Sequence, residues 1–377
     1  MLSEYLAGER LERNMKKILL LCGASQTVLN FRVGLIKALI ESGWQVSVSV
    51  LDSKFKEEIQ TLAIENLYCA EENNRSVNPF AALRLEKYYK KIIKESQPEV
   101  VMTFMLKPNT FGVAAAHKAG VKNIVSMVEG AGDVFINRGL KWAILRKLVC
   151  FLYKKFFRYC KRVIFLNRDD QTEFVGRRLV KEEQCALLPG IGVNLDRFAF
   201  KPLKNQRTFL MVARMLKTKG IYEYCECARI VKRKYPDAVF DYLGAESNVT
   251  LADIREYLDD GSVNYLGVAK DVRPYLENCT IFMLPSYREG VPMSIMEAEA
   301  VGRAVITSDN IGCKETVKDG YNGFLVPKGD AEMMAEKAIW CIEHPEKAEE
   351  MGRNARAFAE EKFNQRKINE KIIGEIL

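Results

Sequence analysis

Two kinds of segment alternate along this chain from Lys16 onward. Short apolar runs, typical of buried strands, precede longer segments in which apolar residues recur every three or four positions, typical of helices. In the first half we predict strands at 18–22, 45–51, 67–70, 100–104, 123–127 and 163–167, and helices at 27–42, 55–62, 78–95 and 109–119. Alternation at this spacing predicts βαβ units on a parallel sheet.

The alternation is interrupted at 188–192 and at Lys201-Pro202, and then it restarts. In the second half we predict strands at 208–213, 239–243, 263–266, 281–285 and 304–307, and helices at 221–235, 251–258, 272–277 and 292–301. The predicted fold class is therefore α/β, with two Rossmann-like domains and a hinge near 189–204. The predicted divisions are a poorly anchored extension at 1–14, domains at 15–190 and 191–360, and a C-terminal helix at 361–377 that could pack back on the first domain.

Composition excludes several classes of protein. The 377 residues are 48% hydrophobic and 28% charged, as in globular domains, and no apolar run approaches the roughly 20 residues of a membrane span. Ten cysteines without a C-x-x-C pair indicate reduced thiols of a cytosolic protein. With only His117 and His344, a histidine-built metal site or a Ser-His-Asp triad is nearly excluded.

The net charge of +8 is unevenly distributed. Nine cations without an intervening acid are Arg138, Lys141, Arg146, Lys147, Lys154, Lys155, Arg158, Lys161 and Arg162, interleaved with aromatic residues and with an apolar stripe at Trp142, Leu145, Leu148, Val149 and Leu152. Residues 139–162 therefore suit an anionic membrane surface. The alternative is a solvated basic helix whose apolar face lies on the core. Nucleic acid is disfavoured as a partner, because no nucleic-acid-binding motif accompanies the basic run.

Nucleotide-binding motifs of two common kinds are missing. The first strand is followed by Cys-Gly-Ala-Ser-Gln-Thr at 22–27 and not by G-x-G-x-x-G, and Asp52 comes slightly late for a ribose ligand. The G-x-x-x-x-G-K-[ST] pattern is absent. NAD-binding and P-loop functions are therefore disfavoured.

The segment 284–297, Leu-Pro-Ser-Tyr-Arg-Glu-Gly-Val-Pro-Met-Ser-Ile-Met-Glu, carries the strongest chemical signal. A strand end, a glycine loop and a helix start place the N–H groups of Met293 and Ser294 where they suit a phosphate. Glu289 and Glu297 can each bind a pair of vicinal hydroxyls, although two such glutamates are also common as surface charge on a helix. Upstream, Arg214 and Lys219 flank a strand-to-helix loop at the same edge and can neutralise a diphosphate without a metal. Ordinary surface charge is the alternative there too, because a further lysine lies between them.

Together these residues resemble the retaining glycosyltransferases of family 4, which have the GT-B fold of two Rossmann-like domains facing across a cleft. The matching pieces are Ala213-Arg214, Lys219-Gly220, Gly244, Leu266-Gly267, Asp271-Val272, Glu289 with Glu297, 299–306 and 319–326. In the first half, Asn30-Phe-Arg32, 107–112 and 129–132 are similar to the branch that extends polyprenyl-diphosphate-linked glycans, including bacterial N-acetylgalactosaminyltransferases.

The resemblance implies a UDP-sugar donor, a lipid-linked glycan acceptor, and neither a cofactor nor a metal. It implies that Arg214 and Lys219 bind the diphosphate, that Glu297 binds the ribose and that Glu289 binds the hexose. Backbone near the donor would come from Gly23, Gly244, Gly290, Val291, Met293 and Ser294. The acceptor would lie near Arg32, Lys107 and Glu129, on an enzyme that is cytoplasmic and peripheral to the inner face of the cell membrane.

One departure concerns the histidine that many family members carry at the cleft of the first domain. Here that stretch reads Thr103-Phe-Met-Leu-Lys107, and we interpret His117, on the following helix, as structural. Either the role of that histidine is absent or Lys107 takes it. The resemblance favours retention by a front-face route, in which the leaving phosphate takes the acceptor proton. The competing functions are a UDP-sugar epimerase of the same fold and a non-catalytic glycan-binding protein at a membrane.

Overall fold

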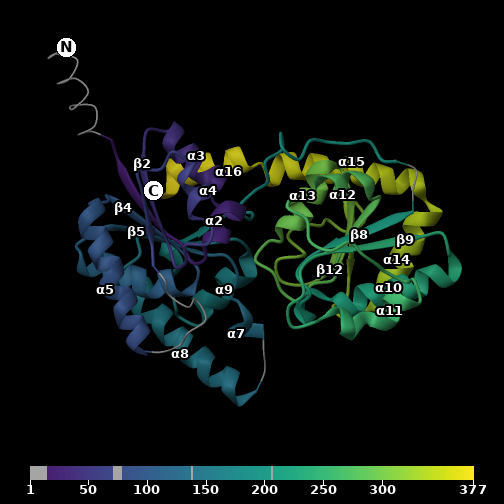
Figure 1. Ribbon diagram of the computed structural model, residues 1–377, viewed down its shortest axis with the longest axis horizontal. Helices are drawn as coiled ribbons and strands as arrows, with labels where there is room; N and C mark the ends of the chain where they lie inside the picture. Colours follow the sequence, from purple (N-terminus) through teal and green to yellow (C-terminus); the bar gives the residue numbers. More distant parts are fainter. Residues whose placement is uncertain (1–14, 71–78, 137–138, 205–206) are drawn as a thin grey trace, which may run out of the picture. The chain divides into compact units, whose positions relative to one another are not determined.

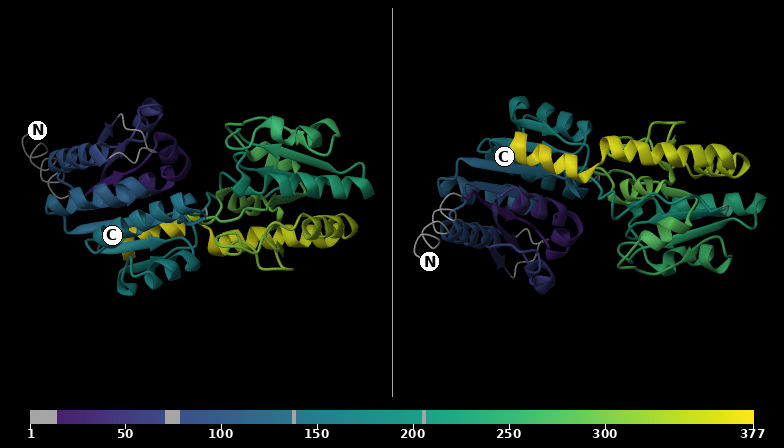
Figure 2. Two further views of the ribbon diagram at one scale, coloured as in Figure 1. Left: turned by 90° about the horizontal axis from the view of Figure 1, so that it is seen from below. Right: turned by 90° about the horizontal axis from the view of Figure 1, so that it is seen from above.

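The computed structural model describes residues 15–70, 79–136, 139–204 and 207–377. The predicted extension at 1–14 lies outside these ranges. The chain forms two compact units, one made of the residues up to Leu188 together with Arg366–Leu377, the other of Pro189–Gln365. Each unit is a parallel sheet between helices (Figures 1 and 2). The prediction of two Rossmann-like α/β domains is confirmed.

The sheet of unit 1 has seven parallel strands in the order β3-β2-β1-β4-β5-β6-β7. They are β1 (Lys17–Leu21), β2 (Gln45–Val50), β3 (Asn66–Cys69), β4 (Val100–Phe104), β5 (Asn123–Val128), β6 (Arg162–Phe165) and β7 (Cys185–Leu187). The central strands are buried on both faces, which explains why they read as continuous apolar runs. The chain order reverses between β1 and β4, the point at which such sheets bind ligands.

The helices of unit 1 cover both faces of its sheet (Figure 1). They are α2 (Ser25–Phe31), α3 (Val33–Glu41), α4 (Lys56–Gln60), α5 (Pro79–Ser96), the π-helical turn η1 (Pro108–Gly112), α6 (Val113–Lys118), α7 (Asp133–Ile136), α8 (Leu140–Phe157), α9 (Arg168–Gly176), the 3₁₀ turn η2 (Glu182–Gln184), α16 (Gln365–Lys371) and η5 (Ile372–Ile376). Apolar side chains of α5, α6, α8 and α9 share one core with the sheet, including Tyr89, Ala115, Phe157 and Phe174. The C-terminal segment packs on unit 1, where Asn123 and Lys161 donate to the Leu377 carbonyl.

The sheet of unit 2 has six parallel strands in the order β10-β9-β8-β11-β12-β13. They are β8 (Thr208–Val212), β9 (Val239–Leu243), β10 (Asn264–Tyr265), β11 (Ile281–Leu284), β12 (Ala304–Ser308) and β13 (Gly323–Val326). The helices are η3 (Lys217–Lys219), α10 (Ile221–Lys234), η4 (Leu251–Ile254), α11 (Arg255–Asp259), α12 (Arg273–Asn278), α13 (Met293–Val301), α14 (Ala331–Glu343) and α15 (Pro345–Lys362). Four buried apolar residues make up β11, the strand that leads into the segment with the strongest chemical signal.

The element predictions fail in a few places. The single helix predicted at 27–42 is two helices, because the backbone leaves helical geometry at Arg32. The predicted helix at 109–119 begins one residue earlier, in the π-helical turn η1. Strands β7 and β13 and helix α9 were not predicted; β7 is only three residues long, too short for a periodic pattern.

Candidate functional site

The predicted donor residues of unit 2 follow the carboxyl ends of its parallel strands. Arg214 follows β8, Gly244 follows β9 and Glu289 follows β11, while Glu297 lies on α13, the helix after β11. Carboxyl ends of parallel strands meet at one edge of the sheet, where ligands of such folds bind. Unit 2 therefore gathers these residues at a single edge.

Lys219 and Glu289 form an ion pair through Nζ and Oε1. The same Oε1 lies 2.6 Å from the hydroxyl oxygen of Ser286, which is fully buried and also lies 3.0 Å from the Thr218 carbonyl. A hydroxyl has one proton to donate, and the shorter contact with a charged acceptor favours Glu289. Ser286 therefore fixes the orientation of the carboxylate, a role that the sequence did not suggest.

A second loop supports the backbone around Glu289. The N–H of Glu289 donates to the Ile311 carbonyl at 3.0 Å, and the side-chain amide of Asn310 donates to the Tyr287 carbonyl. Gly312 has φ +82°, and a Cβ there would lie 2.4 Å from the Glu289 carbonyl oxygen. The loop after β12 therefore needs glycine at this position. Sequence reasoning missed it, although the polar Ser-Asp-Asn that ends a buried strand was a visible signal.

Arg214 is exposed and forms no ion pair with any residue that the structure describes. The backbone beside it is tightly packed, because a Cβ on Gly244 would lie 1.7 Å from the Ala213 carbonyl oxygen. The hydroxyl of Tyr242 donates to that same carbonyl at 2.7 Å. Gly244 thus lets the exits of β8 and β9 approach each other and holds Arg214 at the edge.

Glu297 is a half-buried carboxyl on α13 with an unusual acidity. Its pKa is raised to about 7, chiefly by burial; Arg197 lowers the pKa, and the Asp271 carboxylate raises it. Asp271 itself is ionised, since its ion pair with Arg273 at 2.6 Å holds its pKa at about 2. The Glu297 carboxyl therefore exchanges its proton near neutral pH, where a bound hydroxyl ligand would shift the balance.

The N-terminus of α13, the helix that carries Glu297, is the predicted phosphate site. Pro292 is the N-cap, so Met293 and Ser294 are the first helical residues, and both are half-buried. Their N–H groups have no partner inside the helix, as at every helix start. Val291 is buried, and Gly290 directly precedes it.

In unit 1 the predicted acceptor residues Arg32 and Glu129 form an ion pair. Arg32 is 2% exposed, and its guanidinium carbon lies 4.0 Å from the centre of the Phe104 ring, whereas Glu129 is 25% exposed. Glu129 is therefore the member of the pair that solvent and ligands can reach, and Arg32 fixes its position.

Lys107, the third predicted acceptor residue, is half-buried at the start of η1. The turn before it is strained, because Met105 has φ +71°. A buried network holds that turn: the Thr103 hydroxyl lies 2.7 Å from Asn109 Oδ1, and the Asn109 amide donates to the Met127 carbonyl at 2.8 Å. Lys107 thus follows β4 at the carboxyl edge, on a turn anchored to β5.

Gly23 follows β1 at this edge of unit 1, and its carbonyl accepts from the Leu51 N–H at 2.8 Å. Asp52 accepts from the backbone and the hydroxyl of Ser25, so this carboxylate is used within the fold. His117 lies instead at the end of α6, stacked on Tyr159 with 3.7 Å between ring centres. Because α6 leads into β5, His117 lies at the amino edge, away from the other predicted residues. Across the described ranges no three His, Cys, Asp or Glu side chains are grouped to hold a metal ion.

The basic segment folds into α8, and the predicted apolar stripe divides between two faces. Val149 is buried with Tyr153, Phe156 and Phe157, whereas Leu145 and Leu152 are partly buried against the same core. The opposite face carries a second apolar stripe, of which the sequence analysis named Leu148 alone and assigned it to the first stripe: Leu140, Ile144, Leu148 and Phe151 are 80%, 61%, 48% and 60% exposed. Arg138 lies outside the described residues. None of the helices described has the length and hydropathy that a membrane span requires.

Two family models match the chain. Residues 17–165 match the glycosyl transferase 4-like family, and residues 193–358 match the glycosyl transferases group 1. The chain belongs to this family of glycosyltransferases, and the resemblance drawn from its motifs is confirmed.

Individual relatives are similar over much of their length. An N,N'-diacetylbacillosaminyl-diphospho-undecaprenol alpha-1,3-N-acetylgalactosaminyltransferase of Campylobacter jejuni is 31% identical, over 88% of this chain and 91% of its own. A UDP-Gal:alpha-D-GlcNAc-diphosphoundecaprenol alpha-1,3-galactosyltransferase of Escherichia coli is 27% identical, over 64% and 65%. Among solved structures, Anabaena HepE in complex with UDP shares the fold, with a TM-score of 0.76, 17% identity, and coverage of 95% and 98%.

Proposed function

We propose that this enzyme transfers a hexose or N-acetylhexosamine from a UDP-sugar to a polyprenyl-diphosphate-linked glycan during the assembly of a cell-surface polysaccharide or glycan. The observation that carries the proposal is the 31% identity, over nearly the whole chain, to a transferase whose name states a diphospho-undecaprenol acceptor. Support also comes from the grouping of two cations and two carboxylates at one edge of unit 2.

The donor roles follow from the chemistry of that edge. Arg214 and Lys219 would neutralise the diphosphate with neither a metal nor a cofactor. Glu297 would accept from the ribose hydroxyls, and Glu289, oriented by Ser286, from the hexose hydroxyls. The N–H groups of Gly290, Val291, Met293 and Ser294 would complete the donor site.

In the proposed reaction an acceptor hydroxyl attacks the anomeric carbon while the bond from that carbon to the diphosphate oxygen breaks. The proton of the hydroxyl passes to the departing phosphate on the same face, so the configuration is retained. The cationic pair stabilises charge that grows on the diphosphate as this bond breaks, which is where such donors contribute most.

The acceptor would bind to unit 1 near Glu129 and Lys107, with Arg32 holding Glu129 in place. A polyprenyl chain stays in the bilayer, so the enzyme must reach it there. The exposed apolar face of α8, flanked by lysines, suits peripheral docking on the cytoplasmic face of an anionic membrane.

The direct test is UDP release with a panel of UDP-hexoses and UDP-N-acetylhexosamines, with and without a polyprenyl-diphosphate-linked glycan. We expect acceptor-dependent UDP release, a product heavier by one sugar and in the α configuration, and full activity in EDTA. Conversion of the UDP-sugar to its epimer without transfer would instead establish the epimerase. Loss of activity in EDTA that Mg²⁺ restores would refute the metal-free donor site.

A further inference from the structure

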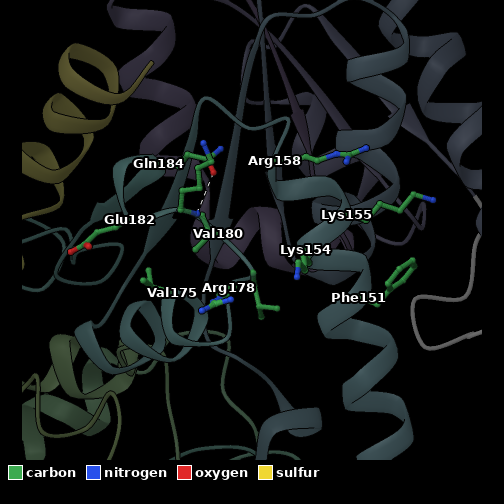
Figure 3. Close-up of a pocket in the computed structure, with 11 residues that line it drawn as sticks. Phe151, Lys154, Lys155, Arg158, Val175, Arg178, Val180, Glu182 and Gln184 are labelled. Atoms are coloured by element: carbon green, nitrogen blue, oxygen red, sulfur yellow. Dashed lines mark hydrogen bonds between the residues drawn. The ribbon is translucent and has the colours of Figure 1, made fainter.

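An open pocket of about 620 Å³ lies beside the C-terminal half of α8 (Figure 3). One wall is α8, and the other is the chain from the end of α9 through η2. Cationic side chains and one aromatic ring surround the opening: Phe151, Lys154, Lys155, Arg158, Arg178 and Lys181. Glu182 is the one acid among the lining residues, so the pocket carries a clear positive charge.

The pocket is separate from the predicted acceptor residues. α8 leads directly into β6, and η2 leads directly into β7, so the pocket lies beside the amino ends of these strands. Glu129 and Lys107 follow β5 and β4 at the carboxyl edge. Because the strands are parallel, these are opposite edges of the sheet of unit 1.

Several of these cations have no acid to neutralise them. Lys154, Lys155, Arg158 and Arg178 form no ion pair with any carboxylate among the residues that the structure describes, and only Lys181 has one, with Glu183 at 3.2 Å. Figure 3 shows Lys154 on the α8 wall and Arg178 on the other wall of the pocket. Beneath them lie the buried side chains of Leu179 and Val180 and the half-buried Val175, which make an apolar floor. A cationic rim over an apolar floor fits an anionic amphiphile better than a free ion.

The backbone at Arg178 adds an independent observation. After α9 the N–H of Arg178 donates to the Val175 carbonyl and the N–H of Leu179 to the Phe174 carbonyl, the pattern of a Schellman motif. Arg178 occupies the left-handed position of this motif with φ +56°, where glycine is usual. A non-glycine residue in such a strained conformation is typical of functional sites, so the position indicates a functional role for the arginine side chain.

The exposed face of α8 connects this pocket to the proposed docking surface. Leu140, Ile144, Leu148 and Phe151 occupy the first two thirds of the face, and Lys154, Lys155 and Arg158 continue the same face to the helix end. The helix has 18 residues and is therefore about 27 Å long. One face thus presents an apolar segment and then a cationic segment that opens into the pocket.

We propose that this pocket binds the phosphate of an anionic phospholipid head group and so fixes how the enzyme sits on the membrane. The proposal deepens the membrane docking in the proposed function and rests on it. Phe151 and its apolar neighbours enter the interface, while Lys154 and Arg178 close on the head-group phosphate from opposite sides.

Vesicle co-sedimentation tests the proposal with the full chain. The vesicles contain phosphatidylcholine alone or with phosphatidylglycerol, at low and high salt. Lys154→Glu/Arg178→Glu is compared with Lys141→Glu/Lys147→Glu, a pair of exposed lysines on the same helix with the same change of charge outside the pocket. We expect the pocket pair to weaken binding to anionic vesicles roughly 30-fold, and the control pair several-fold less.

Equal losses in the two pairs would overturn the pocket and leave diffuse electrostatic docking. A wild-type protein that does not bind anionic vesicles would overturn both the pocket and the docking. Transfer to a short-chain, water-soluble analogue of the lipid-linked acceptor reports on the transferase alone, so its failure is distinguishable from either result.

Arg178→Gly provides a second variant that cannot fail merely by misfolding. Glycine suits φ +56°, so the thermal midpoint should stay the same or rise, while binding to anionic vesicles falls roughly fivefold. Unchanged vesicle binding by this variant would refute a role for the arginine in lipid binding.

Discussion

Glu297 should make both the stability of this enzyme and its affinity for donor depend on pH near 7. The pKa of its carboxyl is raised from an ordinary 4.5 to about 7, chiefly by burial. A raised pKa means that the folded state binds the proton more tightly than the unfolded chain does. The carboxyl therefore does not destabilise the folded state at low pH. As the pH rises from 4.5 to 7, its ionisation increasingly lowers the free energy of unfolding.

Glu297→Gln removes this cost, because glutamine does not ionise. At pH 8 the variant should be more stable than the wild type by up to about 3 kcal/mol, the free energy that corresponds to the raised pKa. At pH 5 the difference should fall below about 1 kcal/mol, because the wild-type carboxyl is then mostly protonated when folded. Urea unfolding at the two pH values measures both differences. Equal stability of the two proteins at pH 8 would refute a raised pKa.

The pH dependence of donor affinity is a second test of Glu297. If ionised Glu297 accepts from the ribose hydroxyls, wild-type affinity for a UDP-sugar should rise as the pH passes through 7, because the ligand favours the ionised form. The diphosphate of a UDP-sugar does not titrate in that range, so the carboxyl accounts for the change. Calorimetry should find Glu297→Gln weaker and independent of pH. A wild-type affinity that is flat or falls through pH 7 would refute the ribose role.

The remaining predictions concern the support of the donor edge. Lys219→Ala should lower turnover about 10²–10³-fold in a UDP-release assay while Lys217→Ala does not, because only the former removes the pair with Glu289 and the proposed diphosphate contact; equal losses would contradict the assignment. Glu289→Gln should not weaken UDP binding in calorimetry, because it also removes the carboxylate that competes with the diphosphate for Lys219, and it should reduce transfer. Ser286→Ala should reduce transfer roughly tenfold and weaken UDP binding by less than that, since it removes one hydrogen bond to a charged group; a loss of UDP affinity as large as the loss of transfer would contradict this positioning role. Gly312→Ala should destabilise the fold by ~1–3 kcal/mol in thermal unfolding, because its Cβ would collide with the Glu289 carbonyl, and a wild-type melting temperature would contradict that packing.

The sequence predicted all strands but β7 and β13, and the edge on which the donor residues lie, because both follow from local patterns. A buried parallel strand is a continuous apolar run, and the residue after it must lie at the carboxyl edge whatever the details of packing. That reasoning placed Arg214 after β8 and Glu289 after β11. Carboxylate spacing and glycine positions then supported the family resemblance, which the comparisons confirm.

Features that depend on tertiary packing could not be predicted from the local sequence. The predicted helix at 27–42 is interrupted at Arg32, whose side chain is buried against Glu129 and Phe104. Both partners are distant from Arg32 in the sequence. Gly312 matters because of the Glu289 carbonyl, 23 positions away and on another strand exit. The periodicity of α8 predicted a single apolar stripe, whereas the helix has an apolar stripe on each of two faces. Which face is buried depends on packing against the core of unit 1, which the local sequence does not reveal.

The pairing of Lys219 with Glu289 has a consequence for donor binding that neither residue suggests alone. Lys219 and Glu289 satisfy each other in this structure, so a diphosphate bound as proposed would draw Lys219 away from an existing partner. With the proposed roles, UDP would do this without offering Glu289 a replacement, whereas the hexose of a UDP-sugar would supply hydroxyls to the carboxylate as the lysine turns to the diphosphate. The complete donor would thus exchange one set of charge-assisted contacts for another. UDP would leave a half-buried carboxylate whose one remaining side-chain partner among the described residues is the Ser286 hydroxyl. On this reasoning the pair favours substrate over product, which would help the enzyme to release UDP after transfer.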